Sequence, residues 1–218
     1  VAFIMVPAWV RDARADLKEV IDKNIRTTSP MQMPFVTHWL NQMEQDKVLN
    51  YMDIPIQHVS GKVLTAMNRT GDARTLRELI ARIRDRVPGI VLRTTVMTGF
   101  PGEGEAEFVE LCQFIQDVKF ERLGCFAFSP EEGTVAASLP GQIEEEEKQR
   151  RRDIVMEEQT RISDAYNQAQ VGKTIPVLVE SYDRYAECWF GRSQGDAPDI
   201  DGKVFFSCPR GAVQPGRL

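Results

Sequence analysis

The sequence predicts an α/β fold in which a parallel sheet is followed by a small antiparallel β-barrel. Apolar strands and amphipathic helices alternate between residues 51 and 128, and a long charged helix follows over about 142–170. Beyond that helix, short strands are separated by turns rich in Asp, Gly and Pro. Strand–helix–strand crossovers of this length are typical of parallel, right-handed βαβ units. Short strands at even spacing instead suit a small antiparallel barrel.

The first part should contain three strands, at 51–57, 90–98 and 123–128, with a helix between each pair. Asp72 is the expected N-cap of the first helix and Pro88-Gly89 its end. The spacing of the apolar residues in both helices places them on one face. In the first helix these are Leu76, Leu79, Ile80, Ile83 and Val87, and in the second Phe108, Leu111, Cys112, Ile115 and Val118.

The long helix carries glutamates four residues before lysine and arginine, which is the favourable orientation for ion pairs on one helix. We expect this charged block to be a solvated face. Strands are then expected at 174–181, 186–190 and 203–208, and the barrel should be incomplete because Leu218 stands where a further strand is due. The expected divisions are an unassigned segment at 1–46, the core at 47–141, the connecting helix at 142–170 and the truncated barrel at 171–218.

Composition restricts the classes of function. The net charge is −5 and the isoelectric point about 5.2, which argues against a protein that binds nucleic acid over its whole surface. No apolar run approaches the roughly eighteen residues of a membrane span, so we expect a cytoplasmic protein with no membrane partner. The four cysteines, at 112, 125, 188 and 208, have no spacing typical of a metal site. We expect Cys112 and Cys125 to be buried core thiols, and none of the four to be a metal ligand.

Three polar or glycine-bearing segments follow the three expected strands. They are Asp53-Ile-Pro-Ile-Gln-His58, Gly99-Phe-Pro-Gly-Glu103 and Phe128-Ser-Pro-Glu-Glu-Gly-Thr134. Ligands of parallel sheets collect at the carboxyl ends of the strands. Glycines allow close approach of a backbone, and a helix N-terminus offers free N–H groups to a polar ligand. The sequence therefore predicts a small-molecule site at this edge.

Several motifs, in order, resemble one enzyme family. YMDIPIQH, the MNR at 67–69, LRTTVMTGFPGE, KFERLG and FSPEEGT are similar to the second half of the radical SAM core of methylthiotransferases. LPGQIEEEEKQRRRDIVMEEQ and the following VGK resemble that family's connecting helix and the start of its TRAM domain. The resemblance runs from about Lys47 to the end. It implies half of a TIM-like radical SAM barrel, then an incomplete, OB-like TRAM barrel.

Two branches of the family fit, one modifying adenosine in tRNA and the other an aspartate of small-subunit ribosomal protein S12. The tRNA branch typically has Gln-Ser-Gly where this chain has Gln57-His58-Val59-Ser60, and Gly191–Asp201 resembles a signature of the aspartate branch. Residues 171–218 hold six Lys/Arg and six Asp/Glu. A region of balanced charge is poorly suited to binding phosphate, and its aspartates are suited to a basic ribosomal protein. The resemblance thus implies methylthio transfer to the aspartate β-carbon. The alternatives are the tRNA enzyme and a non-catalytic binding module bearing a TRAM domain.

The resemblance also implies S-adenosylmethionine, two [4Fe–4S] clusters and a flavodoxin-like electron donor. The sequence has no CxxxCxxC, so we expect no cluster ligands, no catalytic residues and no turnover here, and we interpret the chain as a fragment. By resemblance, S-adenosylmethionine contacts are assigned to Gln57, Arg93, Gly99, Gly102 and Glu103. Substrate contacts are assigned to His58, Ser129, Asp196, Asp199 and Asp201. Two alternatives stay open: His58 can simply pack, and Arg93 can form an outward salt bridge.

Overall fold

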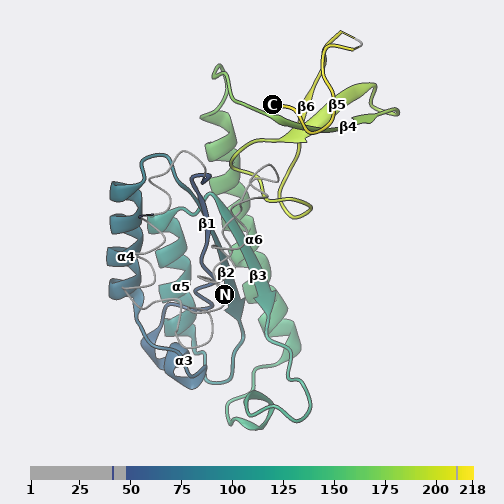
Figure 1. Cartoon of the computed structure of the whole chain (residues 1–218). Coiled ribbons are helices and arrows are strands. Elements are labelled where there is room, and N and C mark those ends of the chain that lie inside the picture. The colour runs from purple at the N-terminus through teal and green to yellow at the C-terminus, as the bar shows by residue number, and fades with distance from the viewer. Residues whose placement is uncertain (1–40, 42–47, 210) are drawn as a thin grey trace, which may run out of the picture.

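The computed structural model describes residues 41, 48–209 and 211–218. A parallel sheet of order β1-β2-β3 is followed by an antiparallel sheet of order β4-β5-β6 (Figure 1). The parallel strands are β1 (Tyr51–Asp53), β2 (Val91–Thr98) and β3 (Arg122–Ala127). The antiparallel strands are β4 (Leu178–Asp183), β5 (Cys188–Arg192) and β6 (Val204–Phe206). This confirms the predicted α/β class.

Helices connect the parallel strands as expected: α3 (Gly61–Ala66) and α4 (Ala73–Arg86) lie between β1 and β2, and α5 (Glu105–Val118) lies between β2 and β3. The long helix α6 (Glu145–Gln168) follows β3 and leads to the antiparallel sheet. The sequence analysis missed α3, because six residues are too few to show a helical period. Asp72 caps α4 as predicted: its carboxylate accepts the Thr75 N–H at 2.8 Å, and the Thr75 hydroxyl accepts the Asp72 N–H at 2.9 Å.

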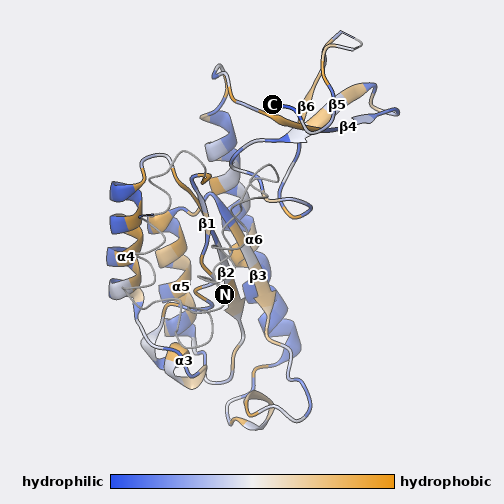
Figure 2. Cartoon of the chain, viewed as in Figure 1, coloured by the Kyte–Doolittle hydropathy of each residue, from blue (hydrophilic) through white to orange (hydrophobic). Residues whose placement is uncertain are grey.

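One face of the parallel sheet is covered by α4, α5 and α6. The side chains of Leu92, Val96 and Leu123 join a buried apolar cluster with these helices, and Figure 2 shows α4 and α5 apolar toward the sheet and polar outside. All five apolar positions predicted for α4 are buried, as are four of the five for α5, where Cys112 is half-buried. The other face of β2 carries Arg93, Thr95 and Met97, all half-buried. The parallel sheet therefore has one face covered by helices and one face whose side chains are half-buried.

Helix α6 runs back along this sheet, antiparallel to the strands. Near its start, the Lys148 carbonyl accepts a hydrogen bond from the Thr98 hydroxyl at 3.3 Å. Farther along, the Gln159 amide donates to the Phe120 carbonyl at 3.0 Å, and Tyr166 packs against residues where β1 and β2 begin. Our expectation of a merely solvated charged helix was incomplete, because Lys148, Gln159 and Arg151 are all buried.

The antiparallel sheet lies at the end of the parallel sheet where β1–β3 begin (Figure 1). Its outer strand β4 is paired by the last residues of the chain: Val179 N–H donates to the Arg217 carbonyl and Gly216 N–H to the Val179 carbonyl, both at 2.8 Å. This pairing protects part of an edge that the sequence analysis left open. Within the described residues, no helix is long and apolar enough to cross a membrane.

Candidate functional site

The three predicted segments meet at the carboxyl edge of the parallel sheet. Gln57 extends this edge, because its N–H donates to the Thr95 carbonyl at 2.9 Å and its carbonyl accepts the Met97 N–H at 2.7 Å. On the other side of β2, the Phe128 N–H donates to the Thr98 carbonyl at 2.8 Å. Gln57, Gly99 and Ser129 therefore follow three neighbouring strands on one edge, as the parallel order predicts.

Gln57 has an unusual backbone conformation, with a φ of 68°. A residue with a side chain rarely occupies this left-handed region, and such outliers cluster at ligand-binding positions. The side chain is half-buried at the edge. This geometry agrees with a ligand-contacting role for Gln57, which stays a prediction.

The two glycines of the Gly99–Glu103 turn differ in their surroundings. Both have positive φ, 76° at Gly99 and 85° at Gly102. A Cβ on Gly99 would overlap the side chain of Lys148, so this glycine lets α6 approach the turn. A Cβ on Gly102 would meet nothing within 4 Å, so the backbone there is open. Of the two glycines assigned to the cofactor, Gly102 has the accessible face.

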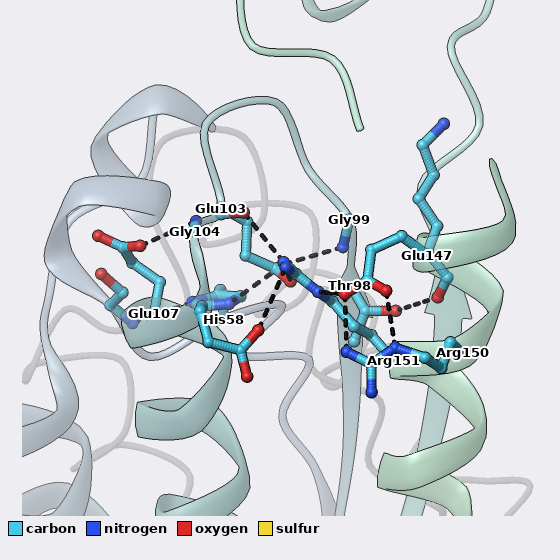
Figure 3. A network of polar contacts seen from close by, with 12 residues as sticks. His58, Thr98, Gly99, Glu103, Gly104, Glu107, Glu147, Arg150 and Arg151 are labelled. Carbon is cyan, nitrogen blue, oxygen red and sulfur yellow. Dashed lines mark hydrogen bonds and ion pairs between the residues drawn. The ribbon is translucent and has the colours of Figure 1, made fainter. Parts of the chain in front are cut away.

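Glu103 does not face the open edge; it is the centre of a buried network (Figure 3). One carboxylate oxygen accepts the Gly99 N–H at 2.9 Å and the other accepts Arg151 Nη1 at 2.8 Å. The same Arg151 nitrogen donates to the Glu103 backbone carbonyl at 2.9 Å. The side chain of Glu103 is fully buried, so our expectation that it contacts the cofactor is contradicted. It holds the turn from behind.

His58 belongs to the same interior, because none of it is exposed. Its Nδ1 accepts the Ser60 N–H at 3.0 Å, so in the neutral ring the proton is on Nε2. That nitrogen lies 3.5 Å from a Glu103 carboxylate oxygen (Figure 3). His58 therefore packs against Glu103, and the assignment to substrate binding is corrected in favour of the packing alternative.

Arg151 links this network to α6, and sequence reasoning missed it. Its Nε donates to Glu147 at 2.7 Å, and it also lies 3.6 Å from Glu105. Burial works against the charged guanidinium, but hydrogen bonds to Glu103 and Glu147 raise its pKa overall. Hydrogen bonds from Arg150 and then Arg151 lower the pKa of Glu147 to about 2. Arg151 and Glu103 are 48 residues apart in the sequence, so no local pattern could have revealed that they pair.

Arg93 lies on the half-buried face of β2, away from the edge. Its Nε is 3.6 Å from Asp53 and its Nη1 3.8 Å from Asp201, a residue of the loop between β5 and β6. Five residue steps of strand, about 16 Å, separate Arg93 from Thr98 at the edge. Arg93 thus faces two carboxylates of the chain, and its assignment to the cofactor stays a prediction.

The three aspartates assigned to substrate do not form an exposed cluster. Asp196 is 5% exposed and paired with Arg122 at 2.9 Å. Asp201 accepts a hydrogen bond from the Tyr51 hydroxyl at 2.9 Å, and its side chain is 7% exposed. Only Asp199 is exposed. We therefore correct the expected docking role of Asp196 and Asp201, because both side chains are buried and face arginines of the same chain.

Ser129 is exposed on the edge, where its hydroxyl donates to Glu131 at 3.2 Å. Its assignment to substrate stays a prediction.

Family models match both parts of the chain. The radical SAM superfamily model matches residues 6–115, which is just over half of the 218 residues, and a TRAM domain model matches 171–218. The chain belongs to the radical SAM superfamily. The first match begins within the segment 1–46, to which the sequence analysis assigned no motif.

Within this superfamily the chain is homologous to RimO-type methylthiotransferases. It is 47% identical to ribosomal protein uS12 methylthiotransferase RimO of Chloroherpeton thalassium over 161 residues, 74% of this chain and 37% of that protein. It is 49% identical to the RimO of Pelotomaculum thermopropionicum over 171 residues, 78% of this chain and 38% of that protein. The chain thus spans under two fifths of the length of these relatives.

Membership of the superfamily implies S-adenosylmethionine and an iron–sulfur cluster, and the residues fit the two differently. The face of Gly102 that a Cβ would occupy is open and suits a small ligand at the sheet edge, although the Gly102 N–H already donates to the Gly141 carbonyl at 2.9 Å. For a cluster, the described residues hold no group of three His, Cys, Asp or Glu able to bind a metal. Burial raises the pKa of Cys112 to about 11 and of Cys125 to about 12, which disfavours the thiolate that a cluster needs. We derive no chemical step through a cluster from these residues.

Proposed function

We propose that this chain acts in the RimO-type reaction, transfer of a methylthio group to the β-carbon of an aspartate in ribosomal protein uS12. The observation that carries the proposal is 47–49% identity to RimO proteins over about three quarters of the chain. The open carboxyl edge supports it, because that edge is where a parallel sheet binds its ligand. A cytoplasmic location and a flavodoxin-like electron donor belong to the same proposal.

In this proposal the edge holds S-adenosylmethionine through Gln57 and the Gly102 backbone, and Ser129 contacts the substrate. The cofactor, when bound, supplies the methyl group and the means of removing hydrogen from the aspartate. The protein's own part is to fix the turn that the cofactor meets. Glu103 does so by accepting the Gly99 N–H while Arg151 holds its other oxygen. Because this pair is buried, water competes little for either bond.

Two glycines with open surroundings allow a matched test of the edge. Gly102 and Gly89 have φ of 85° and 76°, and a Cβ on either would meet nothing within 4 Å. Gly89 precedes β2 at the opposite end of the sheet. Equilibrium dialysis of the purified chain with S-adenosylhomocysteine should show binding that Gly102→Val weakens about tenfold or more, equivalent to 1.4 kcal/mol. Gly89→Val should leave the affinity unchanged. If the two variants changed the affinity equally, the carboxyl edge would not be the binding site.

One observation favours the tRNA-modifying branch as a second candidate. Residues 171–218 have balanced charge in sequence, but Asp196 and Asp201 are paired with Arg122 and Arg93 of the core. Two of the six carboxylates of this region therefore face core arginines, which leaves fewer of them to attract a partner. This weakens the charge argument for a basic protein partner.

Binding measurements separate the two candidates. We expect the chain to bind purified uS12 more tightly than it binds tRNA at physiological salt, since the relatives it matches are named for uS12. Titrating tRNA at several salt concentrations also measures how many of its phosphates are neutralised. Tighter binding of tRNA, with a steep salt dependence and no measurable uS12 binding, would favour the tRNA branch.

A further inference from the structure

The loop of residues 193–201, between β5 and β6, packs against the half-barrel, which here means the parallel sheet with α3–α6. The contact lies at the end of the sheet where β1 and β2 begin. Ala197 is 8% exposed and forms an apolar cluster with Tyr51 and Val91, the first residues of β1 and β2. A Cβ on Gly195 would lie 3.3 Å from the Val91 side chain and 3.2 Å from the Tyr166 hydroxyl. The loop therefore packs closely against the core, at the end opposite to the candidate cofactor edge.

Asp196 connects the fold of this loop to β3. One of its oxygens accepts both the Ser193 N–H, at 3.0 Å, and the Ser193 hydroxyl, at 2.6 Å. Its other oxygen accepts Arg122 Nη2 at 2.9 Å. The Arg122 guanidinium also lies over the Tyr166 ring of α6, 5.2 Å from its centre. A single carboxylate thus joins the loop, the parallel sheet and the end of α6.

Asp201 makes a second connection, to β1 and β2. One of its oxygens accepts the Tyr51 hydroxyl at 2.9 Å and the Ala197 N–H at 2.8 Å. The other lies 3.8 Å from Arg93 Nη1. Tyr51 is 1% exposed, and its burial, followed by the Asp201 charge, raises its pKa, so the hydroxyl keeps the proton that it donates.

A cavity of about 280 Å³ lies beside the loop. Its lining comes from β3, α6, the loop and β6, and includes Arg122, Tyr166, Gln170, Asp196 and Lys203. Among the described residues, the loop thus meets the core through a small apolar cluster and two carboxylates. Of these contacts the carboxylates fix the orientation, because hydrogen-bonded charge pairs are directional and apolar contact is not.

We propose that the 193–201 loop is a latch that fixes the orientation of the antiparallel sheet on the half-barrel, with Asp196 and Asp201 as its positioning residues. The latch has the same role whatever partner the antiparallel sheet binds, so this proposal does not depend on the proposed function. It also explains why these aspartates are buried although the sequence places them in a polar turn.

The test measures a distance across the latch. Spin labels are placed at Arg74→Cys, on α4, and Tyr185→Cys, in the β4–β5 turn, where both native side chains are exposed. The four native cysteines are first replaced by alanine. Pulsed dipolar spectroscopy of the otherwise unchanged chain should give one narrow distance distribution. The double variant Asp196→Asn/Asp201→Asn should broaden it about twofold or more, because an amide cannot keep the paired charge.

Asp199→Asn is the matched control. Asp199 lies in the same loop and carries the same charge, but it is exposed, and its φ of 62° suits asparagine as well as aspartate. This variant should keep the narrow distribution. Far-ultraviolet circular dichroism identifies any variant that has lost its fold. Arg122→Gln should broaden the distribution too, and adding Asp196→Asn to it should broaden it little further, since both remove one pair.

Hydrogen exchange of the unsubstituted chain gives a second, independent measurement. The Ser193 and Ala197 N–H groups donate to the two latch carboxylates, so they should exchange as slowly as the amides of β5. Exchange of both at the rate of an unstructured loop would overturn the proposal. So would an equally narrow distance distribution in the folded Asp196→Asn/Asp201→Asn variant.

Discussion

Replacing Glu103 with glutamine should destabilise the half-barrel strongly. The carboxylate is fully buried and accepts two short hydrogen bonds, from the Gly99 N–H and from Arg151. A glutamine has one acceptor oxygen, so its NH₂ group must face one of these donors. Removing one partner of a buried pair costs about 3–5 kcal/mol. We expect the lower end, because Arg151 keeps Glu147 and the Glu103 backbone carbonyl as partners.

The measurement is thermal unfolding followed by circular dichroism at 222 nm. For a chain of 150–250 residues, about 2–4 °C of midpoint corresponds to 1 kcal/mol, so a loss of about 3 kcal/mol lowers the midpoint by roughly 6–12 °C. Glu105→Gln is the matched control, since it removes a carboxylate that is also near Arg151 but 69% exposed. It should change the midpoint far less. Equal shifts for the two variants would refute the claim that Glu103 anchors the turn.

Three further predictions follow from the described geometry. Gly99→Ala should destabilise the chain by more than the roughly 1–2 kcal/mol that a left-handed alanine costs, because the added methyl group overlaps the Lys148 side chain. In the same thermal unfolding assay, Gly89→Ala should show the conformational cost alone. Burial raises the pKa of Asp53, so the contribution of this residue to stability is present at low pH and lost as pH rises. Asp53→Asn should therefore raise the unfolding midpoint at pH 7, by an amount that shrinks toward pH 3. A lower midpoint at pH 7 would contradict this. Burial raises the pKa of Cys125 to about 12, so iodoacetamide at pH 8 should modify it only after unfolding, as peptide mass spectrometry would show.

Local pattern was enough to predict the longer helices and the parallel order. The apolar spacing from Leu76 to Val87 and the capping residue Asp72 specify α4 within one stretch of chain, and the structure confirms both. The parallel order follows from crossover length and handedness, which need no knowledge of contacts. The meeting of three polar segments on one edge was predictable for the same reason.

The roles of the charged residues were not predictable, because their partners are distant in sequence. Glu103 looks like an ordinary acidic residue at a helix start, yet its partner Arg151 is 48 positions away. Asp201 stands in a polar turn that indicates exposure, yet it bonds Tyr51 across 150 positions. A carboxylate in a sequence shows its charge but not whether a partner will bury it.

Helix α6 acts as a spacer of fixed length. Arg151 near its start is bonded to the turn at the carboxyl edge, and Tyr166 near its end contacts the guanidinium of Arg122 at the other end of the sheet. The fifteen residues between them correspond to about 22 Å of helix and a little over four turns. Inserting one residue would rotate Tyr166 by about 100° and move it about 1.5 Å, so both contacts could not be kept. We therefore expect a change in the length of α6 to disrupt the chain, and one in an exposed turn, such as that around Tyr185, to be tolerated.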